Sequence, residues 1–224
     1  MFKLRLGDRT SLYYLVCDLE ATCIYPPQQD WETEIIEVGA IILNSNLEKV
    51  SEFQEYVQPV INANLTPYCL ELTKITQADV DRAGKFPEVY GRMLTWMREN
   101  GLILQPVMQN FTLITDGVFD CNQYIRYQCI QSKLKYPEWA KSFGNIKKHF
   151  TKVLPHTRKA DKKSNSITEM LAILNIPMDG QLHRALDDAK LVVKIMKGLR
   201  KFRPRFEFRS NEILRTNWEV RFFT

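Results

Sequence analysis

The sequence SLYYLVCDLEAT occupies residues 11–22 and indicates a central strand with a site at its end. Residues 11–19 are almost continuously apolar, which is typical of a strand that is buried on both faces. Asp18 and Glu20 stand two positions apart, so their side chains project from the same face of that strand. Neighbouring carboxylates repel each other unless a cation lies between them, and hard oxygen ligands suit Mg²⁺ or Mn²⁺. Surface strands often carry such a pair, but the apolar residues before this one favour a site at a strand end.

The rest of the chain places two more strands first and then alternates strands with helices. Residues 34–44 and 50–57 are expected to form strands that are joined by a turn, and residues 111–115 a further strand. This order predicts an α/β fold with a mixed central sheet that is flanked by helices. Polar caps and apolar residues at helical spacing predict a short helix from residue 77 and helices over residues 86–99, 119–134, 166–174 and 184–201.

The bulk composition fits one sizeable domain with a short extension. The chain has 224 residues, of which 45% are hydrophobic, and no run approaches the roughly 18 apolar residues of a membrane span. The N-terminus carries no apolar signal region, so we expect an intracellular protein, cytoplasmic or nuclear, that is not secreted. Five cysteines without a CxxC pair predict reduced, mostly buried thiols and no zinc site. We expect residues 1–202 to form the domain and residues 203–224 the extension.

A second acidic pair flanks the start of the helix predicted over residues 119–134. Asp116 and Asp120 follow the strand 111–115, and open α/β sheets bind ligands at strand ends. By themselves these residues fit an ordinary alternative at least as well. In that alternative Asp116 and Gly117 form a turn, and Asp120 stabilises the N-terminus of the helix.

The last predicted helix distinguishes two adjacent aspartates. Its apolar residues recur every three or four positions and define a buried stripe, and Asp188 falls close to that stripe. Asp187 falls on the opposite side, beside lysines, and is expected to be solvated. An unpaired carboxylate that is directed toward the sheet is costly, and a metal would remove that cost. His183 precedes the helix; a single histidine is more often structural than catalytic, but its usual pKa of about 6.5 suits proton transfer.

Three ordered motifs resemble those of the DEDDh 3′→5′ exonucleases. They are DLEATC at residues 18–23, TDGVFD at residues 115–120 and HRALDD at residues 183–188. The similarity extends over residues 12–200. More narrowly, LTKITQ at 72–77 and KLKYP at 133–137 resemble the branch that contains the 3′ histone-mRNA exonuclease, the enhanced-RNAi exonuclease and Snipper. The resemblance implies an RNase H-like exonuclease fold and hydrolysis of RNA or DNA from the 3′ end to nucleoside 5′-monophosphates.

The resemblance also implies a role for each matching acidic residue. Two divalent cations, Mg²⁺ or Mn²⁺, would be held by Asp18, Glu20, Asp120 and Asp188. His183 would be the general base that takes a proton from water. Many relatives have Asn where this chain has Asp116, so Asp116 would support the ligands rather than bind a cation. The motif still leaves some choice between Asp116 and Asp120.

The same motifs place further residues against the terminal nucleotide. Phe119 stands where close relatives often carry Trp and is expected to contact the terminal base. For Leu72 and Ile75, ordinary packing remains an alternative to a contact with that base. The residues that the resemblance places at the substrate are Ala21, Thr22, Leu72, Ile75, Phe119 and His183.

The net charge of +5 is concentrated in two segments. Residues 141–163 hold eight Lys or Arg and one acid, and residues 197–224 hold eight Lys or Arg and three acids. Basic residues near an acidic site suit a polyanionic substrate, although a solvated basic surface is the plain alternative. In the extension, arginines alternate with aromatic residues, which suits either single-stranded nucleic acid or, as we prefer, packing on the domain. The residues expected to follow the phosphate backbone are Lys147, Lys148, Lys152, Arg158, Lys162 and Lys163.

Two other functions remain open at this point. A nucleic-acid-binding module that does not cut would have lost a ligand, and all the ligands are present. A proofreading subunit would need a segment that docks on a polymerase, and residues 203–224 could serve. Histone-mRNA exonucleases carry a small nucleic-acid-binding domain before the nuclease, for which residues 1–17 leave no room. We therefore expect Snipper-like action on 3′ ends of RNA and DNA, without contact to membranes; the sequence indicates no protein partner.

Overall fold

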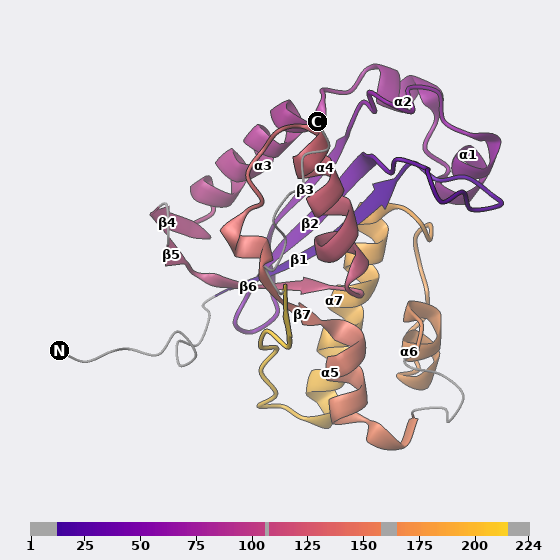
Figure 1. Ribbon diagram of the computed structural model, residues 1–224. Coiled ribbons are helices and arrows are strands. Elements are labelled where there is room, and N and C mark those ends of the chain that lie inside the picture. The colour runs from indigo at the N-terminus through magenta and orange to yellow at the C-terminus, as the bar shows by residue number, and fades with distance from the viewer. Residues whose placement is uncertain (1–12, 106–107, 158–164, 215–224) are drawn as a thin grey trace.

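A six-stranded mixed sheet forms the centre of the protein (Figure 1). The structure, a computed structural model, describes residues 13–105, 108–157 and 165–214. The strands of this sheet are β1 (Tyr13–Ala21), β2 (Ile35–Asn44), β3 (Lys49–Tyr56), β6 (Phe111–Thr115), β7 (Ser142–Asn145) and β8 (Glu212–Ile213). Their order is β3-β2-β1-β6-β7-β8, in which β1, β2 and β3 are antiparallel, β6 and β7 run parallel to β1, and β8 is antiparallel to β7. The predicted mixed sheet is confirmed; β4 (Ile103–Gln105) and β5 (Met108–Gln109) form a separate hairpin.

The predicted helices are present except over one segment, and two further helices, Pro67–Thr73 and Ile146–Val153, were not predicted. The residues predicted as one helix, 119–134, instead form a π-helical turn, η1 (Asp120–Ile125), followed by α4 (Arg126–Gln131). The predicted caps are present, because Thr76 and Ser166 each form a capping box with an acid three residues later. The other helices among the described residues are α1 (Pro67–Thr73), α2 (Gln77–Asp81), α3 (Phe86–Glu99), α5 (Ile146–Val153), α6 (Ile167–Ile173) and α7 (Ala185–Phe202), with single 3₁₀ turns at Glu138–Ala140 and Pro155–Thr157.

Strand β1 separates two hydrophobic cores, and alternation along the strand decides which core each side chain enters. Tyr14 and Val16 pack in one cluster with residues of α5, α6 and α7. Leu15, Cys17 and Leu19 pack on the opposite face with residues of α3, η1 and α4. Because alternate residues share a face, the carboxylates at positions 18 and 20 lie on the side of α7.

Helix α7 begins in direct contact with β2. Gly39 of β2 pairs with Asp18 of β1. A side-chain carbon added at Gly39 would lie 2.2 Å from the nitrogen of Leu186 and 2.3 Å from the carbonyl carbon of Ala185. Both distances are far below any real contact, so only glycine allows the first turn of α7 to reach the sheet at this point.

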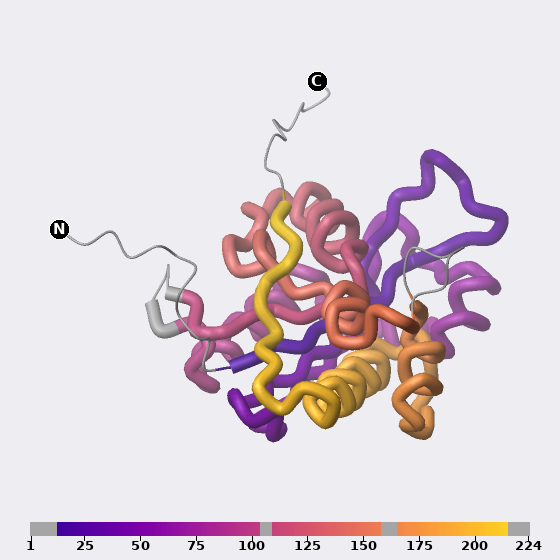
Figure 2. Tube along the Cα trace, turned by 90° about the horizontal axis from the view of Figure 1, so that it is seen from below, coloured from indigo at the N-terminus to yellow at the C-terminus, as the bar shows by residue number. Residues whose placement is uncertain are grey.

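After α7 the chain turns back and runs along the molecule toward the outer edge of the sheet (Figure 2). Phe208 is buried in the same cluster as α5 and α7, with its ring centre 5.9 Å from that of Tyr14 and 5.4 Å from that of His149. Residues 212–213 then pair with β7 as strand β8. The described part of the extension therefore packs against the domain, whereas the aromatic residues from Trp218 onward lie outside the described residues.

Replacing Gly39 by Ala should separate α7 from the sheet. We expect Gly39→Ala to lower the free energy of unfolding by about 3 kcal/mol, because the added carbon meets backbone atoms that cannot turn away. Gly91→Ala is the matched control: Gly91 lies in α3, and nothing lies within 4 Å of its added carbon. That variant should gain about 1 kcal/mol from helix propensity. Urea unfolding followed by circular dichroism measures both values, and a Gly39→Ala protein as stable as wild type would contradict the close approach.

Candidate functional site

A pocket opens where the parallel strands β1 and β6 end beside the first turn of α7. Its volume is about 370 Å³. All five residues that the sequence predicted to act together line this pocket: Asp18, Glu20, Asp120, His183 and Asp188. They come from β1, η1, the loop before α7 and α7 itself. The remaining lining residues are Leu19, Asp116, Gly117, Phe119, Tyr124, Lys147, Ser166, Ile167, Thr168 and Leu182.

The four carboxylates are buried, and burial is the largest cause that raises the pKa of each. For Asp18, the charges of Asp120 and Glu20 add to the effect. Burial and the neighbouring Asp188 raise the pKa of Glu20 to about 9. Burial and Asp116 raise the pKa of Asp120 to about 7, and burial raises that of Asp188 to about 6. Carboxylates crowded in this way are poorly stabilised as anions unless a positive charge joins them.

Three groups of the pocket form a compact set of possible metal ligands. Glu20, His183 and Asp188 each offer an atom, and these atoms all lie within 4.8 Å of one another. One oxygen of Asp188, Oδ2, accepts a hydrogen bond of 3.0 Å from the backbone N–H of His183. Its other oxygen, Oδ1, is buried and has no hydrogen-bond partner among the residues that the structure describes. An unpartnered carboxylate oxygen among crowded acids fits a divalent cation, which would supply the missing positive partner.

The backbone at His183 is turned in an unusual way. Its φ angle is 61°, in the left-handed region that few residues other than glycine adopt. This turn lets the N–H of His183 reach Asp188 while its exposed ring lines the pocket. Partial burial lowers the pKa of His183 below its usual value. The ring is therefore neutral at pH 7 and able to accept a proton.

A buried carboxylate next to the pocket holds the first turn of α7. Glu37 has 0% exposure and pairs across the sheet with Glu20. Its Oε2 accepts hydrogen bonds from the backbone N–H of Ala185, at 3.0 Å, and from Nε of Arg184, at 3.3 Å. The guanidinium of Arg184 also donates to the hydroxyl of Tyr56 and lies 5.4 Å from the centre of its ring. Sequence reasoning missed Glu37, although an acid inside an apolar strand was a visible signal.

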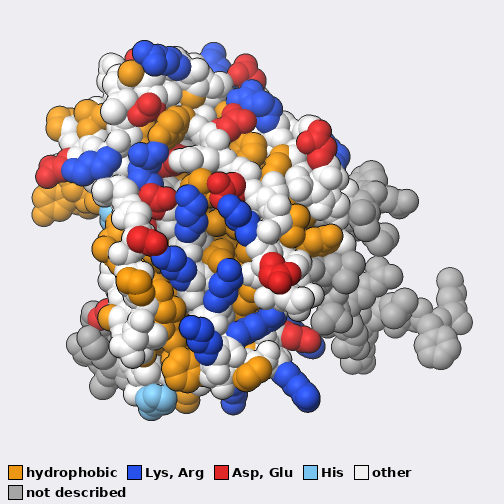
Figure 3. Space-filling model, turned by 180° about the vertical axis from the view of Figure 1, so that it is seen from behind, with side chains coloured by type: hydrophobic (Ala, Val, Ile, Leu, Met, Phe, Trp, Pro, Cys, Tyr) orange, Lys and Arg blue, Asp and Glu red, His pale blue; other side chains and the backbone are white. Residues whose placement is uncertain are grey.

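The two adjacent aspartates of α7 are separated as their helical spacing predicts. Asp188 is buried and faces the pocket, whereas Asp187 is partly exposed. Asp187 accepts a hydrogen bond of 3.0 Å from the backbone N–H of Gln181 and lies 3.5 Å from Nζ of Lys190. On the face shown in Figure 3, Lys and Arg side chains lie among Asp and Glu in the same manner. Asp187 therefore lies at the surface beside a lysine of its own helix.

The lysines of the basic segment after β7 form ion pairs and a ring contact that the sequence did not indicate. Lys147 lies 2.7 Å from Oδ2 of Asp116, so both side chains are engaged inside the pocket. Lys148 forms an ion pair of 2.7 Å with Glu212 of the C-terminal segment, and Lys152 lies 5.9 Å from the ring centre of Phe206. These three lysines therefore do not form a row of unpaired cations. Helix α5, which carries them, packs against acidic and aromatic residues that are distant in the sequence. Arg158, Lys162 and Lys163 lie outside the described residues.

The residues predicted at the substrate divide into accessible and buried ones. Phe119 is 62% exposed at the pocket, directly before η1. Ala21 and Thr22 are buried outside the pocket lining, and the hydroxyl of Thr22 accepts a hydrogen bond of 3.0 Å from the backbone N–H of Glu34. Ile75 has 0% exposure and lies in a hydrophobic cluster with residues of α1 and α2. For Ile75 the structure thus corresponds to the packing interpretation, because this side chain has no surface to offer a base.

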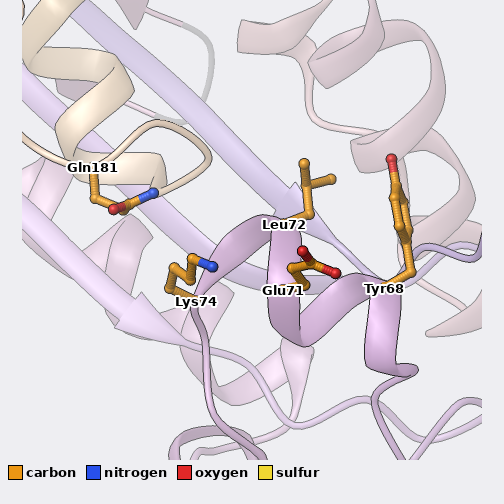
Figure 4. A pocket seen from close by; sticks show the side chains of 5 residues that line it. All are labelled: Tyr68, Glu71, Leu72, Lys74 and Gln181. Atoms are coloured by element: carbon orange, nitrogen blue, oxygen red, sulfur yellow. The ribbon is translucent and has the colours of Figure 1, made fainter.

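Leu72 lines a second groove beside the pocket. Figure 4 shows Tyr68 and Leu72 projecting from the same side of α1, with Gln181 facing Lys74 from a neighbouring loop. The groove has a volume of about 340 Å³. Gln181 is followed by Leu182, which lines the acidic pocket, so the groove and the pocket share one loop.

Several lining residues were not predicted for the site. Tyr124 stands one helical turn after Asp120, and this spacing was the signal that could have indicated it. Ser166 and Thr168 were interpreted only as parts of a helix start. They reach the pocket because α6 packs against α7, which no local pattern encodes.

Comparison with known proteins agrees with this geometry. Residues 15–196 match the exonuclease family RNase_T. The 3′-5′ exoribonuclease 1 of Mus musculus is 35% identical over 207 residues, which cover 92% of this chain and 57% of that protein. The chain thus spans little more than half the length of the curated relatives it matches.

Solved structures give the same result. The nuclease domain of 3′hExo, a DEDDh family member bound to rAMP, superposes with a TM-score of 0.81 at 34% identity, covering 93% of this chain and 100% of that chain. A structure of a 3′-exonuclease that recognises the 3′ end of a histone mRNA stem-loop gives a TM-score of 0.81 at 32% identity, covering 96% of this chain and 71% of that chain. With its fold, its acidic pocket and a family match over most of its length, the chain belongs to the DEDDh exonuclease family.

Proposed function

We propose that this chain is a metal-dependent 3′→5′ exonuclease that releases nucleoside 5′-monophosphates from the 3′ end of RNA and, as in Snipper-like enzymes, of DNA. The observation that carries the proposal is the approach of Glu20, His183 and Asp188 to within 4.8 Å of one another, in a pocket that Asp18 and Asp120 also line. The names of the curated relatives, which are exoribonucleases, support RNA as the first substrate to test.

The carboxylates and the histidine have separate tasks in this proposal. Two divalent cations, Mg²⁺ or Mn²⁺, would be held by Asp18, Glu20, Asp120 and Asp188; when bound, they offset the charge of the phosphodiester and acidify water. His183, neutral at pH 7, accepts the proton of the attacking water at a ring nitrogen. The Lys147–Asp116 ion pair would hold Asp116 in place on the side of the pocket where Asp120 lies. The 3′ oxygen of the preceding nucleotide leaves, and the released nucleotide keeps its 5′ phosphate.

The terminal base would lie between two apolar side chains of the site, one exposed and one half-buried. Phe119 offers an open ring at one side of the pocket, and Leu72 faces the groove at the other. An apolar or aromatic side chain stacks on any base, which suits an enzyme that removes every nucleotide in turn. Contacts of this kind do not require a particular sequence at the 3′ end.

The alternative of a binding module that does not cut has less support, because none of the five predicted catalytic side chains is missing from the pocket. A proofreading subunit is also less favoured. Residues 206–214, part of the segment that would dock on a polymerase, are already packed against this domain.

The decisive experiment uses 5′-labelled RNA and DNA oligonucleotides with and without Mn²⁺ or Mg²⁺. Wild-type protein should shorten the RNA from its 3′ end only when the metal is present. Asp188→Asn should lower the rate by roughly 10³-fold, because it removes a charge that the transition state needs. Asp187→Asn, the matched control on the next residue, should stay within a few-fold of wild type. Metal-independent cleavage, or a stronger effect at Asp187 than at Asp188, would refute the proposal.

His183→Asn tests the role of the general base. Asparagine tolerates the left-handed backbone that His183 adopts, but its amide cannot take up a proton. We expect turnover to fall by roughly 10²–10⁴-fold while Mn²⁺ binding, measured by calorimetry, stays close to wild type. Loss of Mn²⁺ binding in parallel with turnover would instead make His183 a metal ligand, and normal turnover would eliminate both roles.

Phe119→Ala tests the contact with the terminal base. Stacking on an aromatic ring contributes about 1–3 kcal/mol per base, so KM for a short RNA should rise roughly 10-fold with little change in kcat. Tyr127→Ala is the control, because Tyr127 is an exposed aromatic residue of α4, with 43% exposure, outside the pocket lining. An equal effect of the two substitutions would show that exposed rings act only through general surface properties.

A further inference from the structure

Two cysteines that are distant in sequence lie together beside the acidic pocket. Cys23 follows the end of β1, and Cys69 lies in the first turn of α1. Each thiol is the largest influence on the pKa of the other, which places the two sulfurs close together. Sγ of Cys69 also lies 3.9 Å from the carbonyl oxygen of Ala21, so this side chain points at the end of the strand. Cys23 packs against the small hydrophobic cluster that contains Cys69.

The hydroxyl of Thr66 forms hydrogen bonds with the backbones of both cysteines. Oγ1 of Thr66 donates a hydrogen bond of 2.6 Å to the carbonyl oxygen of Cys23. The same oxygen accepts a hydrogen bond of 3.0 Å from the backbone N–H of Cys69, where it caps α1. The approach of the two thiols therefore does not depend on flexible side chains alone.

This pair also differs from the other three thiols in reactivity. Cys23 is partly exposed, whereas Cys17, Cys69, Cys121 and Cys129 are buried. The neighbouring Cys23 lowers the pKa of Cys69 to about 7, while Cys69 and burial raise the pKa of Cys23. Burial raises the pKa of the other three thiols. Because the thiolate is the reactive form, the lowered pKa of Cys69 beside the partly exposed Cys23 favours oxidation at this pair.

We propose that Cys23 and Cys69 form a thiol-modification site, in which a peroxide converts the two thiols into a disulfide that ties α1 to the end of β1. The site lies outside the acidic pocket, and its chemistry does not depend on the nuclease activity. Its reagent class is a small hydroperoxide, which can enter from the exposed side of Cys23.

The reaction balances with hydrogen peroxide as the oxidant. The thiolate of the pair attacks one peroxide oxygen, the O–O bond breaks, and hydroxide leaves a sulfenic acid behind. The second sulfur then attacks the sulfenic sulfur, the S–O bond breaks, and the departing hydroxide takes the remaining thiol proton as water. Two electrons pass from the two sulfurs to the peroxide, which ends as two molecules of water once the first hydroxide takes up the proton that the first thiol released on ionising.

The disulfide would secure the helix that borders the substrate groove. Tyr68 and Leu72, which line the groove in Figure 4, lie on either side of Cys69 in α1. In the reduced protein this short helix is held by Thr66 and by apolar contacts of Ile36, Leu65 and Val80. A covalent bond to the segment just after Glu20 would join the groove to the metal-ligand strand.

Peptide mapping of the full chain tests the proposal directly. Wild-type protein and the variants Cys23→Ser, Cys69→Ser and Cys129→Ser are treated with hydrogen peroxide, and free thiols are then blocked with iodoacetamide. Digestion uses trypsin and a glutamate-specific protease, because Glu20 separates Cys17 from Cys23. We expect one linked peptide pair, containing Cys23 and Cys69, in wild type and Cys129→Ser and in neither of the other variants. Oxidised wild type should also melt at a higher temperature, and dithiothreitol should reverse the shift.

Three outcomes would overturn the proposal. One is a Cys23 that proceeds to sulfinic acid while Cys69 remains free for alkylation. Another is a linked peptide that contains Cys17, Cys121 or Cys129. The third is a disulfide that forms equally well after the protein is unfolded in urea, because the folded arrangement would then play no part. Since Cys69 is buried and its variant could lose stability, Cys23→Ser and the wild-type map decide the result without it.

Discussion

The first turn of α7 lies directly on β2, and the rest of the site depends on that contact. Gly39 leaves the space for it, and Glu37 holds it by accepting hydrogen bonds from Ala185 and Arg184. The register of the sheet places Gly39 opposite Asp18 and Glu37 opposite Glu20. The two positions of β2 that anchor α7 are therefore the cross-strand neighbours of the two carboxylates of β1. A shift of one residue in this pairing would turn the carboxylates and the anchor to opposite faces.

The pocket brings acidic side chains together at positions where burial limits their contact with water. Burial and mutual repulsion raise the pKa of Asp18, Glu20, Asp120 and Asp188, so the protein without cations holds this arrangement at a cost in stability. Only the packing of β1, η1 and α7 around the acids keeps them together. The same features that make the site unfavourable alone make it attractive to divalent cations, since each bound charge replaces repulsion by attraction. The arrangement of acids that would bind the cations is thus the same arrangement that lowers stability in their absence.

Much of the fold could be predicted from local patterns. The apolar run before Asp18 and the caps at Thr76 and Ser166 predicted elements that the structure contains, because capping and alternation act over only a few residues. Helical spacing was also enough to separate Asp188 from Asp187, since the angle between adjacent residues is a property of the helix itself. The motifs indicated which residues would meet in the pocket. The single helix expected over residues 119–134 begins instead as the π-helical turn of Asp120–Ile125, a change that no spacing rule reveals.

By itself the sequence determined the order of the first three strands and of most helices, the face on which each motif residue lies, and the set of acids that form the pocket. The tertiary structure alone decided which partners these residues have. Lys147 pairs with Asp116 instead of standing free, Ile75 is enclosed by packing, and Cys23 meets Cys69. The physical reason is the range of the interactions. Periodicity and capping act between near neighbours in the chain, whereas an ion pair or a thiol contact between distant segments exists only after the sheet register and the helix packing have brought them together.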